Sequence, residues 1–345
     1  MQRMLWAILG GFVITLIIGP TMIKLLMRLK VGQQIYEGAP SEHMKKQGTP
    51  TMGGLMIAAV SLAVTFAARV GAGGSYGSYD WKSDALIAVA VFALLNMALG
   101  FADDFLKIRR RRNQGGLKEL QKTIPQVVVA LGFSAYCYFH PLIGSSIRLP
   151  FTVREWDLGY WYIPIMAFAI YCTLNAANFL DGLDGLLGSV GLCDFAAFGV
   201  MALILAGTVG ASDRQDMWLN VAILCAGMAG ALMGYLRYNL HPASLMMGDT
   251  GSMYIGAVFV GAAMTLRLPL WIPVAGLMMV VSLLSTTIQR YYFKATHGKR
   301  LFLNSPFHHH LEKKGMGEER IVSMYVLITI LMCLLCFLML PEGML

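Results

Sequence analysis

Residues 321–340 read IVSMYVLITILMCLLCFLML, and none of these 20 residues carries a charge. A helix needs about 20 mostly apolar residues to span the hydrocarbon core of a bilayer. Only helices and closed barrels satisfy their backbone polar groups in lipid, and this run is unbroken rather than alternating. The stretch therefore predicts a transmembrane helix.

The rest of the chain has the same character. Of its 345 residues, 57% are hydrophobic and 13% are charged, whereas an average soluble domain has roughly 25% charged residues. We expect an all-α, polytopic integral membrane protein in which residues 1–345 form one domain. The ten predicted spans are 5–26, 52–70, 85–102, 123–140, 160–179, 185–208, 217–236, 253–267, 270–291 and 321–340.

The basic residues predict the orientation in the membrane. One set of loops holds 20 of the 27 Lys and Arg residues. Loops rich in Lys and Arg face the cytoplasm, so both termini are expected outside. These charges are typical of topology signals and of contact with anionic lipid, and we expect no nucleic-acid partner.

Two adjacent carboxylates, Asp103 and Asp104, follow the third predicted span. Lys107 comes one helical turn later, which brings its amine near both carboxylates. Neighbouring carboxylates repel each other unless a cation lies between them. The pattern fits a metal site or a proton-abstraction site, and it also fits a charged helix end at the membrane surface.

Polar residues recur every three positions at the inner end of the fifth span, as Asn175, Asn178, Asp181 and Asp184. Three residues turn a helix by about 300°, so successive members are neighbours but the first and last cannot share one face. Two glycines in this stretch predict a break that lets the carboxylates curl back into a site. The alternative is a polar turn between two spans.

A glycine-rich turn, Met-Gly-Asp-Thr-Gly-Ser at 247–252, opens the eighth span. Asp249 thereby lies at a helix N-terminus, where backbone N–H groups and the helix dipole favour phosphate. Mg²⁺ usually binds one or two carboxylates together with substrate phosphates, so Asp249 is a predicted Mg²⁺ ligand. Asn239 precedes the turn. Asp249 and Ser252 could instead serve only as helix caps.

Three consecutive histidines, His308, His309 and His310, lie in the last predicted cytoplasmic loop. Adjacent side chains point in different directions, so they fit a shared metal site poorly. Imidazoles titrate near neutral pH and suit contact with a diphosphate or proton transfer; an accidental tract is the alternative. Lys46, in a Gly- and Thr-rich stretch before the second span, could bind phosphate.

All these groups fall on the predicted cytoplasmic side. Ionisable residues at membrane depth cost free energy and are functional by default. Carboxylates, a glycine-rich turn, histidines and lysines at one face indicate Mg²⁺-dependent chemistry on a diphosphate, with an apolar co-substrate in the bilayer.

Five motifs, in this order, resemble those of the polyprenyl-phosphate N-acetylhexosamine-1-phosphate transferases, and in particular the phospho-N-acetylmuramoyl-pentapeptide-transferase family. The resemblance covers about residues 30–320. The motifs are His-x-x-Lys-x-Gly-Thr-Pro-Thr-Met-Gly-Gly (43–54), Asp-Asp (103–104), Asn-x-x-Asn-x-x-Asp-Gly-Leu-Asp-Gly (175–185), Met-Gly-Asp-Thr-Gly-Ser (247–252) and His-His-His-x-Glu (308–312).

The resemblance implies transfer of phospho-N-acetylmuramoyl-pentapeptide from its UDP carrier to undecaprenyl phosphate, which gives lipid I for peptidoglycan and releases UMP. It also implies a bacterial plasma (inner) membrane protein with ten spans, Mg²⁺ and a homodimer. Carried over by position, it assigns catalytic roles to Asp103, Asp104, Asp249 and His308, and Mg²⁺ ligation to Asp249 and Asp181. The substrate-binding residues that it implies are Lys46, Lys122, Asn175, Asn178, Asp181, Asp184, Asn239, His309 and His310.

Two other functions compete with this interpretation. One is a sister transferase that uses a different UDP-N-acetylhexosamine. The other is a lipid transporter or flippase, which should place its ionisable groups near mid-membrane and between repeats, whereas here they gather at one face. Two reaction routes are compatible with the residues, direct in-line attack and a two-step path through an aspartyl-phosphate.

Overall fold

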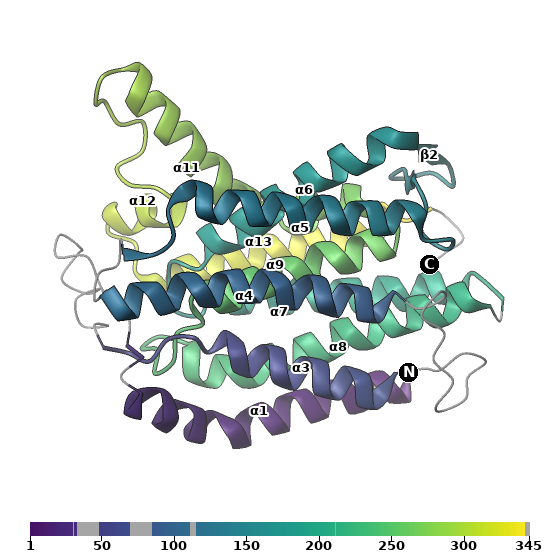
Figure 1. Ribbon diagram of the computed structural model, residues 1–345, viewed down its shortest axis with the longest axis horizontal. Coiled ribbons are helices and arrows are strands. Elements are labelled where there is room, and N and C mark those ends of the chain that lie inside the picture. The colour runs from purple at the N-terminus through teal and green to yellow at the C-terminus, as the bar shows by residue number, and fades with distance from the viewer. Residues whose placement is uncertain (30, 33–47, 70–84, 111–114, 211, 342–345) are drawn as a thin grey trace.

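Long helices that run side by side make up most of the protein (Figure 1). The computed structural model describes all residues except 30, 33–47, 70–84, 111–114, 211 and 342–345. The long helices are α1 (Gln2–Arg28), α3 (Gly54–Ala68), α4 (Leu86–Arg110), α5 (Glu119–Phe139), α6 (Tyr162–Leu180), α7 (Leu186–Gly207), α8 (Asp213–Asn239), α9 (Gly248–Thr265), α11 (Leu277–Ala295) and α13 (Glu318–Leu338). The short elements are the antiparallel strands β1 (Ser146–Arg148) and β2 (Glu155–Asp157), the 3₁₀ turns η3 (Gly159–Trp161) and η4 (Pro269–Trp271), and the helices α10 (Ile272–Ala275) and α12 (Phe307–Lys313).

Helical structure occupies the core of every predicted span, which confirms the all-α class of a polytopic membrane protein. In the described part of the chain, six helices are long and apolar enough to cross a bilayer. A seventh span results if the bent pair 269–275 and 277–295 is counted as one. The total of ten therefore stays a prediction.

The ninth predicted span is not one straight helix. Its two parts, η4–α10 and α11, meet at an angle of 79°. Gly276 ends α10 and precedes α11, and it has no side chain to pack there. Pro273 lies in the first turn of α10, where its missing N–H removes no helical hydrogen bond.

The helix that carries the glycine-rich turn is the most enclosed part of the bundle. Every residue of α9 from Thr250 to Thr265 is buried, and α9 packs against α4, α6 and α3. A helix that is apolar all round belongs in the interior. Its first turn is therefore held by surrounding helices, which suits a site that needs fixed geometry.

Small residues bring the neighbouring backbones close to this first turn. A Cβ at Gly100 of α4 would collide with the carbonyl oxygen of Asp249, and one at Gly54 of α3 would collide with the backbone of Gly251. Residues without side chains allow such close approach between membrane helices. These contacts set α4 directly against the start of α9.

Different elements of the chain lie at the two ends of the bundle (Figure 1). The beginning of α1, the end of α13 and the β1–β2 hairpin lie at one end (Figure 1). The end of α4, the start of α9 and α12 lie at the other. The described residues nearest the two termini are therefore on the same side, and the assignment of that side to the outside stays a prediction.

Candidate active site

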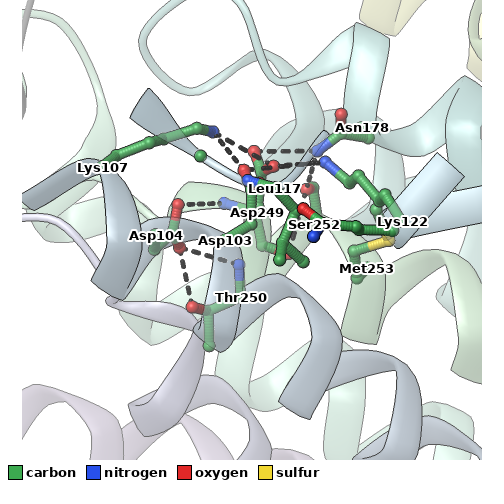
Figure 2. A network of polar contacts seen from close by, with 12 residues as sticks. Asp103, Asp104, Lys107, Leu117, Lys122, Asn178, Asp249, Thr250, Ser252 and Met253 are labelled. Carbon is green, nitrogen blue, oxygen red and sulfur yellow. Dashed lines mark hydrogen bonds and ion pairs between the residues drawn. The ribbon is translucent and has the colours of Figure 1, made fainter. Parts of the chain in front are cut away.

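Four helices bring polar side chains together at the end of the bundle where α12 lies (Figure 2). The residues Asp103 and Asp104 are 3% and 5% exposed. Burying carboxylates is costly unless they are paired and hydrogen-bonded, and each has such partners here. The cluster consists of Asp103, Asp104 and Lys107 from α4, Lys122 from α5, Asn178 from α6, and Asp249, Thr250 and Ser252 from α9.

The carboxylate of Asp249 contacts side chains from three other helices. Its Oδ2 atom lies 2.6 Å from Lys122 Nζ and 3.2 Å from Lys107 Nζ. Its Oδ1 atom accepts a hydrogen bond from the side-chain amide of Asn178 at 3.0 Å. Charge-assisted hydrogen bonds of this kind are strong and directional, so they hold the carboxylate in one orientation.

Both ammonium groups also pair with Asp103. Lys107 Nζ lies 2.6 Å and Lys122 Nζ 3.8 Å from Asp103 Oδ2. The other oxygen of Asp103 accepts the backbone N–H of Leu117 at 2.7 Å, and a Cβ at Gly116 would lie only 2.5 Å from it. The turn before α5 therefore fixes one oxygen of Asp103 and leaves the other facing the lysines.

Asp104 points in a different direction. Its oxygens accept the backbone N–H groups of Asp249 at 3.2 Å and Thr250 at 2.9 Å, and also the Thr250 hydroxyl at 2.7 Å. Asp104 thus caps α9 from a neighbouring helix, where free N–H groups and the helix dipole favour an anion. The sequence predicts that Lys107 lies near both Asp103 and Asp104. Among the described contacts, Lys107 forms a direct ion pair with Asp103 and not with Asp104.

A cavity of about 210 Å³ opens beside the cluster. It is lined by Asp104, Lys107 and Asp249, and by Asp181 and Gly182 from the loop after α6. Burial raises the pKa of Asp181, and repulsion by Asp249 raises that pKa further. The cluster and cavity together hold four carboxylates and two ammonium groups, which leaves an excess of negative charge when all are ionised.

Three of the carboxylates fit a divalent cation. Asp103, Asp104 and Asp249 each offer an oxygen atom, and these atoms all lie within 4.8 Å of one another. Mg²⁺ prefers oxygen ligands and usually combines protein carboxylates with substrate phosphates. Asp181, the other predicted Mg²⁺ ligand, lines the same cavity but is not a member of this group of three.

The predicted break after the fifth span is present. Residues 181–185 separate α6 from α7, and Gly185 has a φ of +76°, a left-handed conformation that glycine adopts without steric cost. Asn175 donates to the carbonyl of Tyr171 at 2.8 Å and, at 3.5 Å, to the side chain of Gln126. Within the motif, Asn178 and Asp181 therefore face the cluster and cavity, while Asn175 bonds elsewhere.

Two other predicted substrate-binding residues belong to a second cluster. Asp184 Oδ2 lies 3.2 Å from His241 Nδ1 and accepts the backbone N–H of Ala243 at 3.0 Å. Asn239 accepts the backbone N–H of Gly185 at 3.1 Å. These bonds join the loop after α6 to the loop between α8 and α9.

The three histidines lie on α12 and have different surroundings, as their spacing predicts. His308 is fully buried against the loop after α6, where a Cβ at Gly182 would collide with its Nε2 atom. His309 pairs with a glutamate on the same helix at 2.9 Å, and His310 accepts a backbone N–H from the preceding loop at 3.0 Å. His308 therefore packs directly against Gly182, a residue that lines the cavity.

Sequence reasoning did not single out three residues of these networks. They are Gln126 beside Asn175, and His241 and Glu318 at the second cluster. Each lies far along the chain from its partners, so no spacing pattern connects them. Lys46, which was predicted to bind phosphate, lies outside the described residues.

Comparison with known proteins adds an independent finding. Residues 86–267 match the family model described as glycosyl transferase family 4. Residues 46–57 match phospho-N-acetylmuramoyl-pentapeptide-transferase signature 1. The phospho-N-acetylmuramoyl-pentapeptide-transferase of Clostridium novyi (strain NT) is 39% identical over 343 residues, which cover 99% of this chain and 98% of the relative. The proteins of the same name from Clostridium kluyveri (strain NBRC 12016) and Thermoanaerobacter sp. (strain X514) are 38% and 37% identical, and both alignments cover 98% of this chain, with 99% and 98% of the respective relative.

Proposed function

Because this chain belongs to glycosyl transferase family 4 and to the phospho-N-acetylmuramoyl-pentapeptide-transferases, we propose that the cluster around Asp249 is where it carries out their reaction. The chain is a multi-pass membrane enzyme. It transfers phospho-N-acetylmuramoyl-pentapeptide from a UDP carrier to undecaprenyl phosphate, giving lipid I for peptidoglycan synthesis and UMP. The observation that carries the proposed site is the convergence of Lys107, Lys122 and three carboxylates beside one cavity.

The two lysines are the proposed partners of the donor's diphosphate. Lys107 lines the cavity, and both ammonium groups lie within 3.2 Å of Asp249. Phosphoryl transfer depends mainly on positioning and on charge stabilisation of phosphate oxygens. Held by carboxylates on two helices, these cations are already oriented before a diphosphate arrives, so little reorganisation is needed.

We propose Mg²⁺ as the cofactor, with Asp249 and Asp181 as ligands and Asp103 beside them. The excess of carboxylates over ammonium groups supports this proposal, because a dianionic diphosphate would otherwise meet net negative charge. When bound, Mg²⁺ supplies neutralisation of the charge that develops on the diphosphate as it breaks.

The proposed reaction is direct in-line attack by an undecaprenyl phosphate oxygen on the β-phosphorus of the donor. The new P–O bond forms as the bond to UMP breaks. Both the attacking and the leaving group are phosphates of low pKa, so no strong base is required. Asp103, with one oxygen fixed by Leu117 and the other beside the lysines, is placed to accept a residual proton.

We place the site on the cytoplasmic face of the bacterial inner membrane. The positions of 20 of the 27 Lys and Arg residues support this orientation, and a soluble, highly charged UDP donor reaches a site on that face without crossing lipid. The homodimer that the family resemblance implies is also a proposal, which crosslinking in native membranes would test.

The function is tested by UMP release from purified protein in detergent with undecaprenyl phosphate and Mg²⁺. UDP-N-acetylmuramoyl-pentapeptide is compared with UDP-N-acetylglucosamine. We expect release that requires both the lipid and Mg²⁺ and occurs only with the muramoyl donor. Release from the glucosamine donor alone would move the chain to the sister transferases, and release from neither would favour the transporter hypothesis.

A further inference from the structure

Three separate segments meet at the imidazole of His241. His241 belongs to the loop between α8 and α9, and its Nδ1 atom lies 3.2 Å from Asp184 Oδ2 in the loop after α6. The same Nδ1 atom lies 3.6 Å from Oε2 of Glu318, the first residue of α13. Glu318 Oε2 also accepts the backbone N–H of Asp184 at 3.4 Å. One exposed ring therefore connects two buried acids from distant parts of the chain.

The burial of these groups makes their charges important. The side chains of Asp184 and Glu318 are 1% and 4% exposed, whereas that of His241 is 40% exposed. Two carboxylates that are close together and shielded from water repel each other strongly. The imidazole lies between them, within 3.2 Å of one carboxylate and 3.6 Å of the other, and it offsets this repulsion when it carries a proton.

Backbone amides link this arrangement to the loops on either side. Ala243 N–H donates to Asp184 Oδ2 at 3.0 Å, and Gly185 N–H donates to Asn239 at 3.1 Å. Together with the amide of Asp184, which donates to Glu318 of α13, these N–H groups report on whether the loop after α6 stays joined to α13, to the end of α8 and to the loop that follows α8. Peptide segments that open locally exchange their amide hydrogens faster than segments held by such bonds.

Both loops form part of the wall of the active-site cavity. Asp181, Gly182 and Leu183 line the cavity from the loop after α6, and Met246 lines it from the loop between α8 and α9. An interaction that holds these loops together therefore acts on the wall of the cavity. It also ties the cavity wall to α13, which directly follows the histidine-bearing α12.

We propose that His241, Asp184 and Glu318 form an electrostatic clasp that positions this wall of the cavity for the UDP-linked donor. His241 is a positioning residue in this proposal, because it acts on the donor through Asp184 and the two loops. The effect on the donor rests on the proposed function, whereas the effect on the loops does not.

Hydrogen–deuterium exchange of the purified protein at pH 6, below the usual imidazole pKa of about 6.5, tests the clasp itself. In His241→Ala, the amides of Asp184, Gly185 and Ala243 should exchange roughly tenfold faster than in the wild type. In His241→Ala combined with Glu318→Gln, removal of one carboxylate relieves the repulsion and should restore most of the protection. His241→Gln, which keeps an N–H donor without the charge, should behave like His241→Ala and serves as the second variant if the alanine protein does not fold.

A matched control removes a different ion pair at the same end of the bundle. Arg290 of α11 binds Glu119 of α5 at 2.8 Å, and both side chains are exposed. Arg290→Ala should leave the exchange of the three reporter amides unchanged, because exposed ion pairs contribute little. Unchanged protection in both His241 variants, or faster exchange that Glu318→Gln does not reverse, would overturn the clasp.

Steady-state kinetics then test its role in donor binding. We expect His241→Ala to raise the KM for the UDP-linked donor roughly tenfold, with kcat within about twofold of the wild type, because the loss is in ground-state positioning. The KM for undecaprenyl phosphate should not change. An unchanged donor KM would refute the positioning role. A wild-type protein without UMP release would refute the proposed function instead, and the exchange data would still decide on the clasp.

Discussion

Replacement of Asp249 by asparagine is the most direct test of the proposed centre. Asparagine keeps the size of the side chain but removes the charge that holds Lys122 Nζ at 2.6 Å and Lys107 Nζ at 3.2 Å. A hydrogen bond to a charged group contributes about 1.5–3 kcal/mol, so two such bonds amount to about 3–6 kcal/mol. If the full amount is lost in the transition state, kcat falls by about 10²–10⁴.

The assay measures initial rates of UMP release at saturating concentrations of both substrates. Thermal unfolding in detergent checks the fold, which we expect to persist because Lys107 keeps its 2.6 Å ion pair with Asp103. The matched control is Asp213→Asn, which neutralises an acid in the first turn of α8 at the opposite end of the bundle and should not affect turnover. Turnover of a folded Asp249→Asn protein within about threefold of the wild type, under about 0.7 kcal/mol, would refute the assigned role.

Three further predictions address the neighbouring residues and the reaction route. Asp104→Ala removes the cap of α9 and should lower the free energy of unfolding by about 1–2 kcal/mol. Asp103→Ala should instead reduce turnover, with a smaller loss of stability. Equal unfolding midpoints for the two variants would contradict this division of roles. Burial raises the pKa of Asp181 above its usual 3.8, so the stability associated with this group is lost as pH rises through its folded pKa. Asp181→Asn should therefore unfold at a higher temperature than the wild type at pH 7 in a chelator, with a gain that shrinks as the pH falls toward 3.8; a constant gain would argue against ionisation of Asp181 as the cause. A donor made chiral at the β-phosphorus should give product of inverted configuration, and retention would instead indicate a two-step route through an enzyme phosphate.

The positions of the long helices follow directly from the sequence because an apolar run of span length has few alternatives in lipid. The run at 270–291 shows the limit of this argument. Residues 270–281 carry no polar side chain, yet the chain bends by 79° near Gly276. Hydropathy reports how well a segment dissolves in lipid but contains no information on its direction. Gly276 is the local signal of the break, and it does not determine the angle.

In the candidate site, local spacing predicts local pairs. The ion pair between Asp103 and Lys107 follows from their i,i+4 relation on one helix. The contacts of Asp184 could not be found in this way, because His241 is 57 residues and Glu318 134 residues away along the chain. Such contacts depend on how the loops between helices are packed, and no periodicity in the sequence encodes that packing.

The two adjacent aspartates serve different purposes because of simple helix geometry. Consecutive side chains on a helix point about 100° apart, so only one of the two can face the start of α9. Asp104 does so, and its oxygens are occupied by the N–H groups of Asp249 and Thr250. Asp103 is then the member with an oxygen directed at Lys107 and Lys122.

This arrangement connects the fold to the proposed chemistry. The amide that Asp104 binds is that of Asp249, so a carboxylate on α4 fixes the backbone position of the residue whose side chain binds both lysines. The close approach of α4 and α9 at Gly100 makes this bond possible. A side chain larger than glycine at position 100 would separate the two helices and move Asp249 away from Lys107 without altering any charged group. We therefore infer that the reactivity of the cluster depends on helix packing one turn deeper in the bundle as much as on the charged residues themselves.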